Sequence, residues 1–217
     1  SVAELKKLLA HPDRRLRQEA QFTLVDKQET AALQDVAAKS SDSPLARLHA
    51  IWGLEQLVRR GQDAAKLVTP VIALATSDNV EVRAQVAKVI GETKLAAGNE
   101  TLLKLLKDDD ARVRYFAAVS LGKLRNKDSV PALLEVLSEN QDQDPVLRHG
   151  AVFGLVGAAV SPAQLIEAAK GGTPAVRLGV VLALRRLESP EISQYLVDSE
   201  PKVVLEAARA IHDLPLG

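Results

Sequence analysis

Apolar and small residues recur at fixed distances along the chain, in a pattern that repeats seven times. Each copy has an anchor position, an apolar residue before it, a small residue three positions after it, and Leu or Ile seven positions after it. The anchors are Arg17, Arg47, Arg83, Arg114, Arg148, Arg177 and, in the last copy, Val204. At 100° per residue these positions fall on one narrow arc of a helix, so each copy predicts a helix with that arc in the core. We call it the B helix.

A second, shorter helix precedes each B helix. Between two B helices, residues 128–137 carry Pro131 in the expected first turn and an apolar face of three leucines. Asp128 is the expected N-cap of this A helix. Asp110 is the expected N-cap of the B helix that precedes it, at residues 110–122. In the third repeat Pro70 follows a helical stretch at residues 64–68, so we expect a kink or break there.

Successive anchors lie 27 to 36 residues apart. A period near this value predicts stacked two-helix repeats. We therefore expect an all-α, right-handed α-solenoid (superhelix) of about seven repeats, forming one repeat domain over residues 1–217. The position six after each anchor is mostly small, which suits closely packed helices; it holds Thr23, Gly53, Val89, Ser120, Gly154, Ala183 and Ala210.

Composition narrows the chemistry. The formal net charge is zero, so the overall electrostatic potential of the chain does not attract nucleic acid. Hydrophobic residues make up 47% of the chain, enough for a sizeable core. There is no cysteine, which excludes disulfides and thiolate sites. The apolar run at residues 150–160 is too short for a membrane span. Because the sequence lacks methionine and its terminal repeats lack polar caps, we expect it to be a segment of a longer chain.

Residues 111–122, Ala-Arg-Val-Arg-Tyr-Phe-Ala-Ala-Val-Ser-Leu-Gly, and their six cognates closely resemble HEAT repeats, in particular those of phycobilisome lyases. The resemblance covers nearly the whole chain and implies the solenoid fold. It specifies function poorly, because scaffolds, lyases and hydroxylases share it.

A narrower resemblance rests on residues 11–22 and 45–54. These stretches are similar to the repeat region of large planctomycete and verrucomicrobial proteins. There, HEAT repeats join a membrane-bound dehydrogenase propeller to a c-type haem domain. The resemblance implies an adjacent domain as partner and an extracytoplasmic location; without it, a cytoplasmic one is expected. No Cys-x-x-Cys-His haem attachment is present, so we expect no cofactor on this segment.

Positions one and five after the anchors lie roughly opposite the core arc and should line the concave surface. They are apolar or aromatic in most repeats, and His49 stands beside them at position two. The candidate partner-binding residues are Leu48, His49, Trp52, Tyr115, Val119, His149, Phe153, Leu178 and Leu182. An exposed apolar strip marks an interaction surface. Packing against neighbouring B helices is the alternative, and the sequence leaves both open.

Charged residues also repeat. Asp13, Asp78, Asp110 and Asp144 stand four or five residues before their arginines, and we expect an Asp–Arg ladder between repeats.

Catalytic motifs are not recognisable. HEAT-repeat metal hydroxylases bind iron through His-Glu pairs, whereas the cognate dipeptides here are His49-Ala50 and His149-Gly150. We interpret the four histidines as surface residues and expect no metal, no catalytic residue and no enzymatic activity. The predicted function is a scaffold that docks a protein or a neighbouring domain along the concave face. The alternatives are a bilin lyase or chaperone using the same groove and, less favoured because few cations line it, a nucleic-acid-binding protein.

Overall fold

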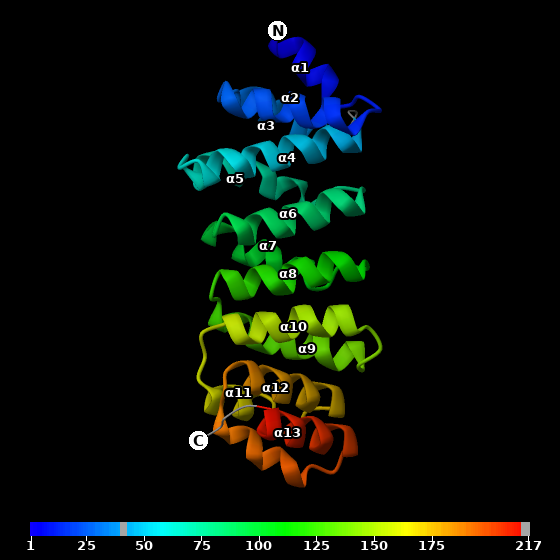
Figure 1. Cartoon of the computed structure of the whole chain (residues 1–217), viewed down its shortest axis with the longest axis vertical. Helices are drawn as coiled ribbons and strands as arrows, with labels where there is room; N and C mark the ends of the chain where they lie inside the picture. Colours follow the sequence, from blue (N-terminus) through cyan, green and yellow to red (C-terminus); the bar gives the residue numbers. More distant parts are fainter. Residues whose placement is uncertain (40–42, 214–217) are drawn as a thin grey trace. The chain divides into compact units, whose positions relative to one another are not determined.

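The computed structural model describes residues 1–39 and 43–213, and every element in these ranges is helical (Figure 1). The A helices, some of them 3-10 (η), are α1 (Val2–Leu8), α3 (Thr30–Ala38), α5 (Ala64–Ile72) with η1 (Ala73–Thr76), α7 (Asn99–Leu105), α9 (Val130–Asn140), α11 (Pro162–Ala168) and η4 (Pro190–Val197). The B helices are α2 (Arg14–Asp26), α4 (Pro44–Arg59), α6 (Val80–Glu92), α8 (Ala111–Lys123), α10 (Pro145–Gly157), α12 (Pro174–Arg186) and α13 (Pro201–Asp213). The short η2 (Ala96–Gly98) and η3 (Lys127–Ser129) precede α7 and α9.

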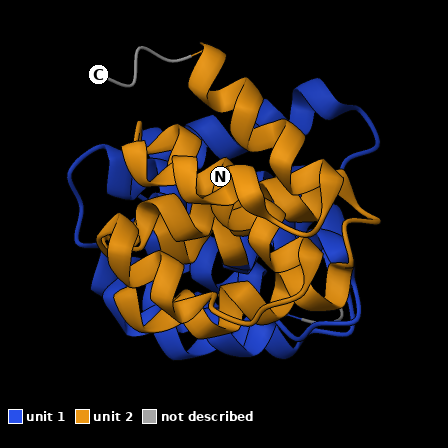
Figure 2. Cartoon of the chain, turned by 90° about the horizontal axis from the view of Figure 1, so that it is seen from below, with its two compact units in different colours: residues 1–117 blue, residues 118–217 orange. Residues whose placement is uncertain are grey.

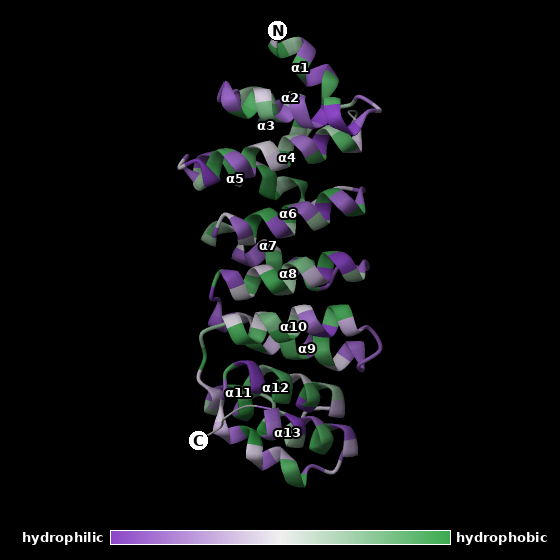
Figure 3. Cartoon of the chain, in the orientation of Figure 1, coloured by the Kyte–Doolittle hydropathy of each residue, from purple (hydrophilic) through white to green (hydrophobic). Residues whose placement is uncertain are grey.

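Within each unit, B helices pack on their own A helices and on neighbouring B helices. Thus α3 packs on α4, and α4 lies between α2 and α6; likewise α9 packs on α10, and α12 lies between α10 and α13. Hydrophobic and hydrophilic residues alternate along the helices, and several of the turns are hydrophilic (Figure 3). The prediction of an all-α array of two-helix repeats is confirmed.

The predicted core positions are buried. The residues three after the anchors are all at most 1% exposed; they are Ala20, Ala50, Val86, Ala117, Ala151, Val180 and Ala207. Those seven after the anchors are equally buried in the first six repeats, from Leu24 to Leu184. An exception among the residues preceding the anchors is Leu16, which is 41% exposed. Stacking therefore buries one continuous stripe of each B helix.

The chain forms two compact units, unit 1 (residues 1–117) and unit 2 (residues 118–217), with the boundary inside α8 (Figure 2). In unit 1, α2 and α6 begin at side-chain caps: Asp13 accepts from the Arg15 N–H and Asn79 from the Val82 N–H. In unit 2, Asp144 accepts from two N–H groups of α10. The single domain over residues 1–217 remains a prediction.

Two local expectations need correction. Helix α5 is not broken at Pro70 but continues to Ile72, where the 3-10 turn η1 begins. The Lys66 carbonyl, which receives no N–H from Pro70, accepts from Gln34 Nε2 at 3.2 Å instead. Asp128 does not cap α9. It lies inside η3, where Asn126 accepts its N–H, and α9 begins at Val130.

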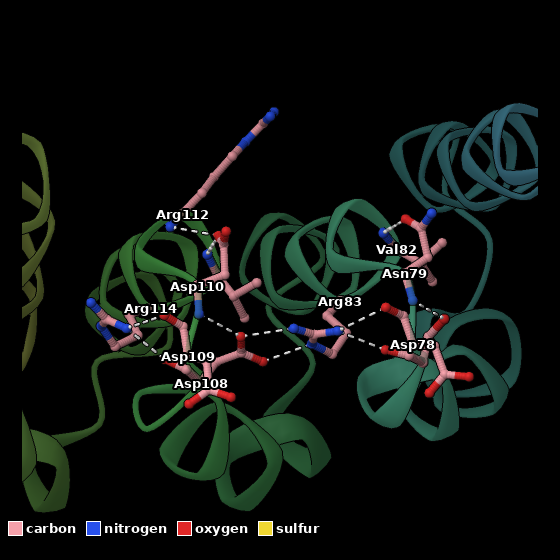
Figure 4. Close-up of polar contacts among 11 residues, drawn as sticks. Asp78, Asn79, Val82, Arg83, Asp108, Asp109, Asp110, Arg112 and Arg114 are labelled. Carbon is pink, nitrogen blue, oxygen red and sulfur yellow. Dashed lines mark hydrogen bonds and ion pairs between the residues drawn. The ribbon is translucent and has the colours of Figure 1, made fainter.

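The arginine ladder exists, but with other partners than predicted (Figure 4). Nη1 of Arg83 and Nη1 of Arg114 each donate to the backbone carbonyls five and six residues earlier. These hydrogen bonds stabilise the turns that precede α6 and α8. The Nε and Nη2 atoms of Arg83 bind both carboxylate oxygens of Asp108 at 2.7 and 2.9 Å. Arg177 binds Asp198 in the same bidentate way. Asp13, Asp110 and Asp144 cap helices instead.

The correct partner stands six residues before the anchor of the next repeat. Asp108 and Asp198 occupy this position, as does Ser77, whose hydroxyl accepts from Arg47. Asp142 occupies it in the fifth repeat, but it pairs with Arg148 of its own repeat. In the sixth repeat the position is Gly171. The cognate partner of Arg17 is Ser41, which lies outside the described residues.

We expect Asp108→Ala to lower the free energy of unfolding by about 2 kcal/mol, because it leaves the largely buried Arg83 guanidinium without its counter-charge. Urea denaturation measures the loss. Asp109→Ala is the matched control, since that neighbouring residue is exposed, and should change stability by less than about 0.5 kcal/mol. Equal losses in the two variants would show that the ladder contributes nothing.

Candidate functional site

The structure separates the predicted partner-binding residues by burial. Leu48, His49 and Leu178 are buried, at 5%, 7% and 5% exposure, and so do not form open surface. His149 is exposed. The remaining candidates are partly exposed: Trp52, Tyr115, Val119, Phe153 and Leu182. The predicted strip is therefore part surface and part packing.

By unit, Leu48, His49, Trp52 and Tyr115 belong to unit 1, and the other five candidates to unit 2. Of the four in unit 1, the rings of His49 and Trp52 lie together on α4, in an edge-on contact with centroids 5.1 Å apart. Tyr115 instead contacts the ring of Phe116. The His49–Trp52 pair is the centre from which the candidate site is built.

His49 is held by α2 rather than exposed, which corrects its interpretation as a surface residue. Arg17 Nε donates to His49 Nε2 at 3.2 Å. Because arginine is always a donor, Nε2 must be an acceptor, so Nδ1 carries the proton and donates to Gln21 Oε1 at 2.7 Å. Position two after the anchor lies on the outer side of an isolated helix, but here Arg17 and Gln21 of the neighbouring helix cover it.

This environment keeps His49 neutral. Burial, together with the positive charges of Arg17 and Arg14, lowers its pKa from 6.5 to about 4. The imidazole is therefore a fixed, uncharged acceptor at neutral pH.

From Trp52 a chain of polar contacts crosses to the next B helices of unit 1. The indole Nε1–H donates to Gln85 Oε1 at 2.9 Å, and Gln85 Nε2 donates to Glu81 Oε1. Arg112 pairs with the other Glu81 oxygen at 2.9 Å and lies over the Phe116 ring. These contacts fix the orientation of the indole, while part of its ring stays open to solvent.

A pocket of about 260 Å³ opens beside the indole, between α2 and α4. Amide and aromatic side chains dominate its wall, with one cation and no carboxylate among the lining residues. We call it the Trp52 pocket; it is lined by Arg14, Gln18, Gln21, Phe22, His49, Trp52 and Gln56. A larger hollow of about 500 Å³ lies against α1, but lysines and alanines rather than aromatic rings form most of its wall.

One wall residue has an unmet hydrogen-bonding requirement. Gln56 Oε1 is buried and accepts no hydrogen bond from any part of the chain that the structure describes. Buried acceptors are normally satisfied, and an unsatisfied one costs about 1–3 kcal/mol. Gln56 itself lines the pocket, so a ligand reaches this buried oxygen if the side chain turns toward it.

Of the residues lining the Trp52 pocket, the sequence identified only Trp52 and His49 as candidates. Gln18 and Phe22 stand at positions one and five of the first repeat, on the predicted strip, but are not among the candidates. Gln21 and Gln56 lie at other helical positions. The available signal was the recurrence of glutamine on an otherwise apolar face.

Within residues 1–39 and 43–213 no group of three or more His, Asp or Glu side chains is placed to hold a metal ion. No helix in these ranges is long and apolar enough to cross a membrane.

The chain is similar to proteins of several kinds. A family model described as HEAT repeats matches residues 68–156, less than half of the chain. Deoxyhypusine hydroxylase of Kluyveromyces lactis is 35% identical over 132 residues, which cover 57% of this chain and 39% of that protein. Bilin biosynthesis protein PecE of Mastigocladus laminosus is 28% identical over 155 residues, covering 65% of this chain and 56% of that protein.

The chain thus spans roughly half or less of the length of these curated relatives. Among solved structures, a designed armadillo repeat protein superposes with a TM-score of 0.51 at 17% identity, covering 98% of both chains, which shows the shared fold. The HEAT-repeat resemblance and the similarity to a phycobilisome-lyase-type protein are confirmed. The resemblance to dehydrogenase-associated repeats remains a prediction.

These relatives correct one prediction. We expected no enzymatic activity because no catalytic motif is recognisable, but the matched relatives are named for a hydroxylase and for bilin biosynthesis, both enzymatic roles. The physical reason is that a solenoid assembles a site from side chains on successive repeats, so that the absence of a local motif excludes little.

Proposed function

We propose that the chain binds a partner polypeptide through the B helices of unit 1, with the Trp52 pocket as the anchoring site. The partner is a separate protein or a neighbouring domain of a longer chain, as the resemblance to dehydrogenase-associated repeats implies. The observation that carries the proposal is the buried, unpaired Gln56 Oε1 in a wall shared with Trp52 and Phe22.

The chemistry of the wall suits a peptide. An extended backbone presents an N–H and a C=O at each residue, and carboxamide side chains both donate and accept hydrogen bonds. The side-chain amide of Gln18 makes no hydrogen bond to any described residue, so it is available to a ligand. The half-open rings of Trp52 and Phe22 offer apolar surface for a partner side chain, and tryptophan is the commonest kind of binding anchor.

Selection from a phage-displayed library of random dodecapeptides, followed by calorimetry of the enriched peptides, tests this proposal. Trp52→Ala should weaken binding at least about 10-fold, the effect expected of an anchor residue. Phe153→Ala is the matched control, because Phe153 occupies the same repeat position in unit 2, and should leave binding within about twofold.

Thermal melting of each variant checks that it is folded. If Trp52→Ala does not fold, Gln56→Leu, which removes the acceptor at nearly constant size, takes its place. Failure to enrich any peptide, or equal binding by wild type and these variants, would overturn the proposal.

A second candidate is tetrapyrrole binding in the same pocket, favoured by the similarity to the bilin biosynthesis protein and by the combination of Arg14 with two aromatic rings. Biliverdin should then quench the fluorescence of Trp52, the only tryptophan, and change its own absorption. An unchanged biliverdin spectrum would eliminate this candidate.

A further inference from the structure

The charge around the Trp52 pocket is unbalanced, and this bears on what the pocket accepts. On the basis of the proposed function, this charge defines the chemical class of polypeptide that the pocket binds. Arg17 is buried, at 9% exposure, yet its guanidinium contacts only neutral groups among the described residues: His49 Nε2 and the carbonyls of His11 and Pro12. Buried charges are normally paired with a counter-charge.

Three of the other anchor arginines have a carboxylate partner: Arg83, Arg148 and Arg177 pair with Asp108, Asp142 and Asp198. Arg47 and Arg114, like Arg17, donate only to neutral groups among the described residues. The Nε of Arg17 meets the neutral His49 imidazole. No described carboxylate pairs with Arg17, and its positive charge acts on the pocket wall to which His49 belongs.

A second cation lies in the wall itself. Arg14 is exposed, lines the pocket, and forms no ion pair or hydrogen bond with any described residue. The neighbouring Arg15 differs, since it pairs with Asp13 at 3.1 Å. The positive charges of Arg14 and Arg17 both act on His49, whose ring lines the same pocket, and both lower its pKa.

We propose that the Trp52 pocket binds an acidic peptide segment, whose carboxylate pairs with Arg14 while an adjacent aromatic side chain packs against Trp52 and Phe22. A guanidinium fork binds a carboxylate through two parallel hydrogen bonds, and the uncompensated charge of Arg17 behind the wall adds to the attraction. A peptide N–H donates to Gln56 Oε1. Cationic segments are rejected by the same field.

Three probes that differ only in charge test this inference: Ac-(Glu-Phe)3-NH2, Ac-(Gln-Phe)3-NH2 and Ac-(Lys-Phe)3-NH2. None contains tryptophan, so the emission of Trp52 reports binding by the full chain. At about 0.15 M ionic strength the Glu peptide should bind roughly 10-fold tighter than the Gln peptide, and the Lys peptide weakest. The preference should shrink as salt is added.

Substitutions of Arg14 test whether this cation causes the preference for the Glu peptide. Arg14→Gln should abolish the preference for the Glu peptide over the Gln peptide, and Arg14→Glu should reverse it in favour of the Lys peptide. Arg15→Gln, an adjacent exposed arginine already paired with Asp13, should leave the order unchanged.

Equal binding of the Glu and Gln peptides would overturn the inference and leave the proposed function standing. So would enrichment of lysine-rich or arginine-rich sequences in the library selection. If none of the three probes binds while selected peptides bind through Trp52, the acidic class is likewise wrong. The proposed function itself fails only if no peptide of any composition depends on Trp52.

Discussion

Lowering the pH from about 7 to about 4 should remove up to about 3 kcal/mol of unfolding free energy through His49 alone. In the folded chain burial and two arginines hold the pKa of His49 at about 4, whereas in the unfolded chain it returns to about 6.5. Between pH 4 and pH 6.5, His49 is protonated in the unfolded state but stays neutral in the folded state. The contribution is therefore complete above pH 6.5, declines as the pH falls, and stops declining below about 4.

His49→Gln isolates this effect. A glutamine can accept from Arg17 and donate to Gln21, as the neutral imidazole does, but it does not titrate. Urea denaturation at a series of pH values should show wild-type stability falling more steeply than that of the variant between pH 6.5 and 4.

The titration of the ion-paired Asp108 and Asp198 carboxylates does not alter the difference between wild type and His49→Gln. The arginine partners of Asp108 and Asp198 lower the pKa of these groups below the usual value, so their contribution is lost at still lower pH and in both proteins alike. Parallel curves for wild type and His49→Gln would show that His49 is protonated as readily in the folded chain as in the unfolded one.

Gly154→Ala should lower the unfolding free energy of unit 2 by about 3 kcal/mol. A Cβ at this position would lie 2.7 Å from the carbonyl oxygen of Ala118 on α8 and 2.8 Å from a methyl group of Leu133. Backbone atoms inside a packed helix cannot withdraw, so α10 must separate from α8. The helix-propensity gain of about 1 kcal/mol offsets only part of this cost.

Gly53→Ala is the matched control, because Gly53 holds the same repeat position on α4. There the new Cβ would meet methyl groups of Leu33 at 2.9 and 3.1 Å, and a side-chain tip can rotate away. This substitution should cost less than about 1 kcal/mol. Calorimetric unfolding that finds equal losses at Gly53 and Gly154 would mean that backbone proximity does not distinguish the two repeats.

The repeat core was predictable because every copy satisfies the same packing rule. Ala50, Ala117 and their cognates are buried as expected, since stacking demands a small residue there in each repeat. The ladder partners were not, because their position is occupied by Asp108, Asp142 and Asp198 in three repeats but by Ser77 and Gly171 in others, and Asp142 binds the arginine of its own repeat. Three of the four recurring aspartates, Asp13, Asp110 and Asp144, are helix caps, a local role that produces the same regularity, whereas Asn79 rather than Asp78 caps α6.

The Trp52 pocket was only half predictable for a different reason. Helical geometry identified Trp52 and Phe22 as outward-facing, but it could not show that α2 approaches α4 closely enough to bury His49. Nor could it show that Gln56 would be left with an unpaired acceptor in the wall. Both features depend on contacts between repeats, which the periodicity of one helix does not contain.

The central claim is that a peptide occupies the Trp52 pocket, and the chain offers one direct observable for it. Trp52 is the only tryptophan, so the ¹⁵N-labelled protein has a single indole N–H resonance. During titration with Ac-(Glu-Phe)3-NH2 this resonance should shift progressively and saturate, because the ligand packs on the ring whose N–H is bound to Gln85. A resonance that stays unmoved at saturating peptide, while backbone signals elsewhere shift, would place binding outside the pocket and contradict the account.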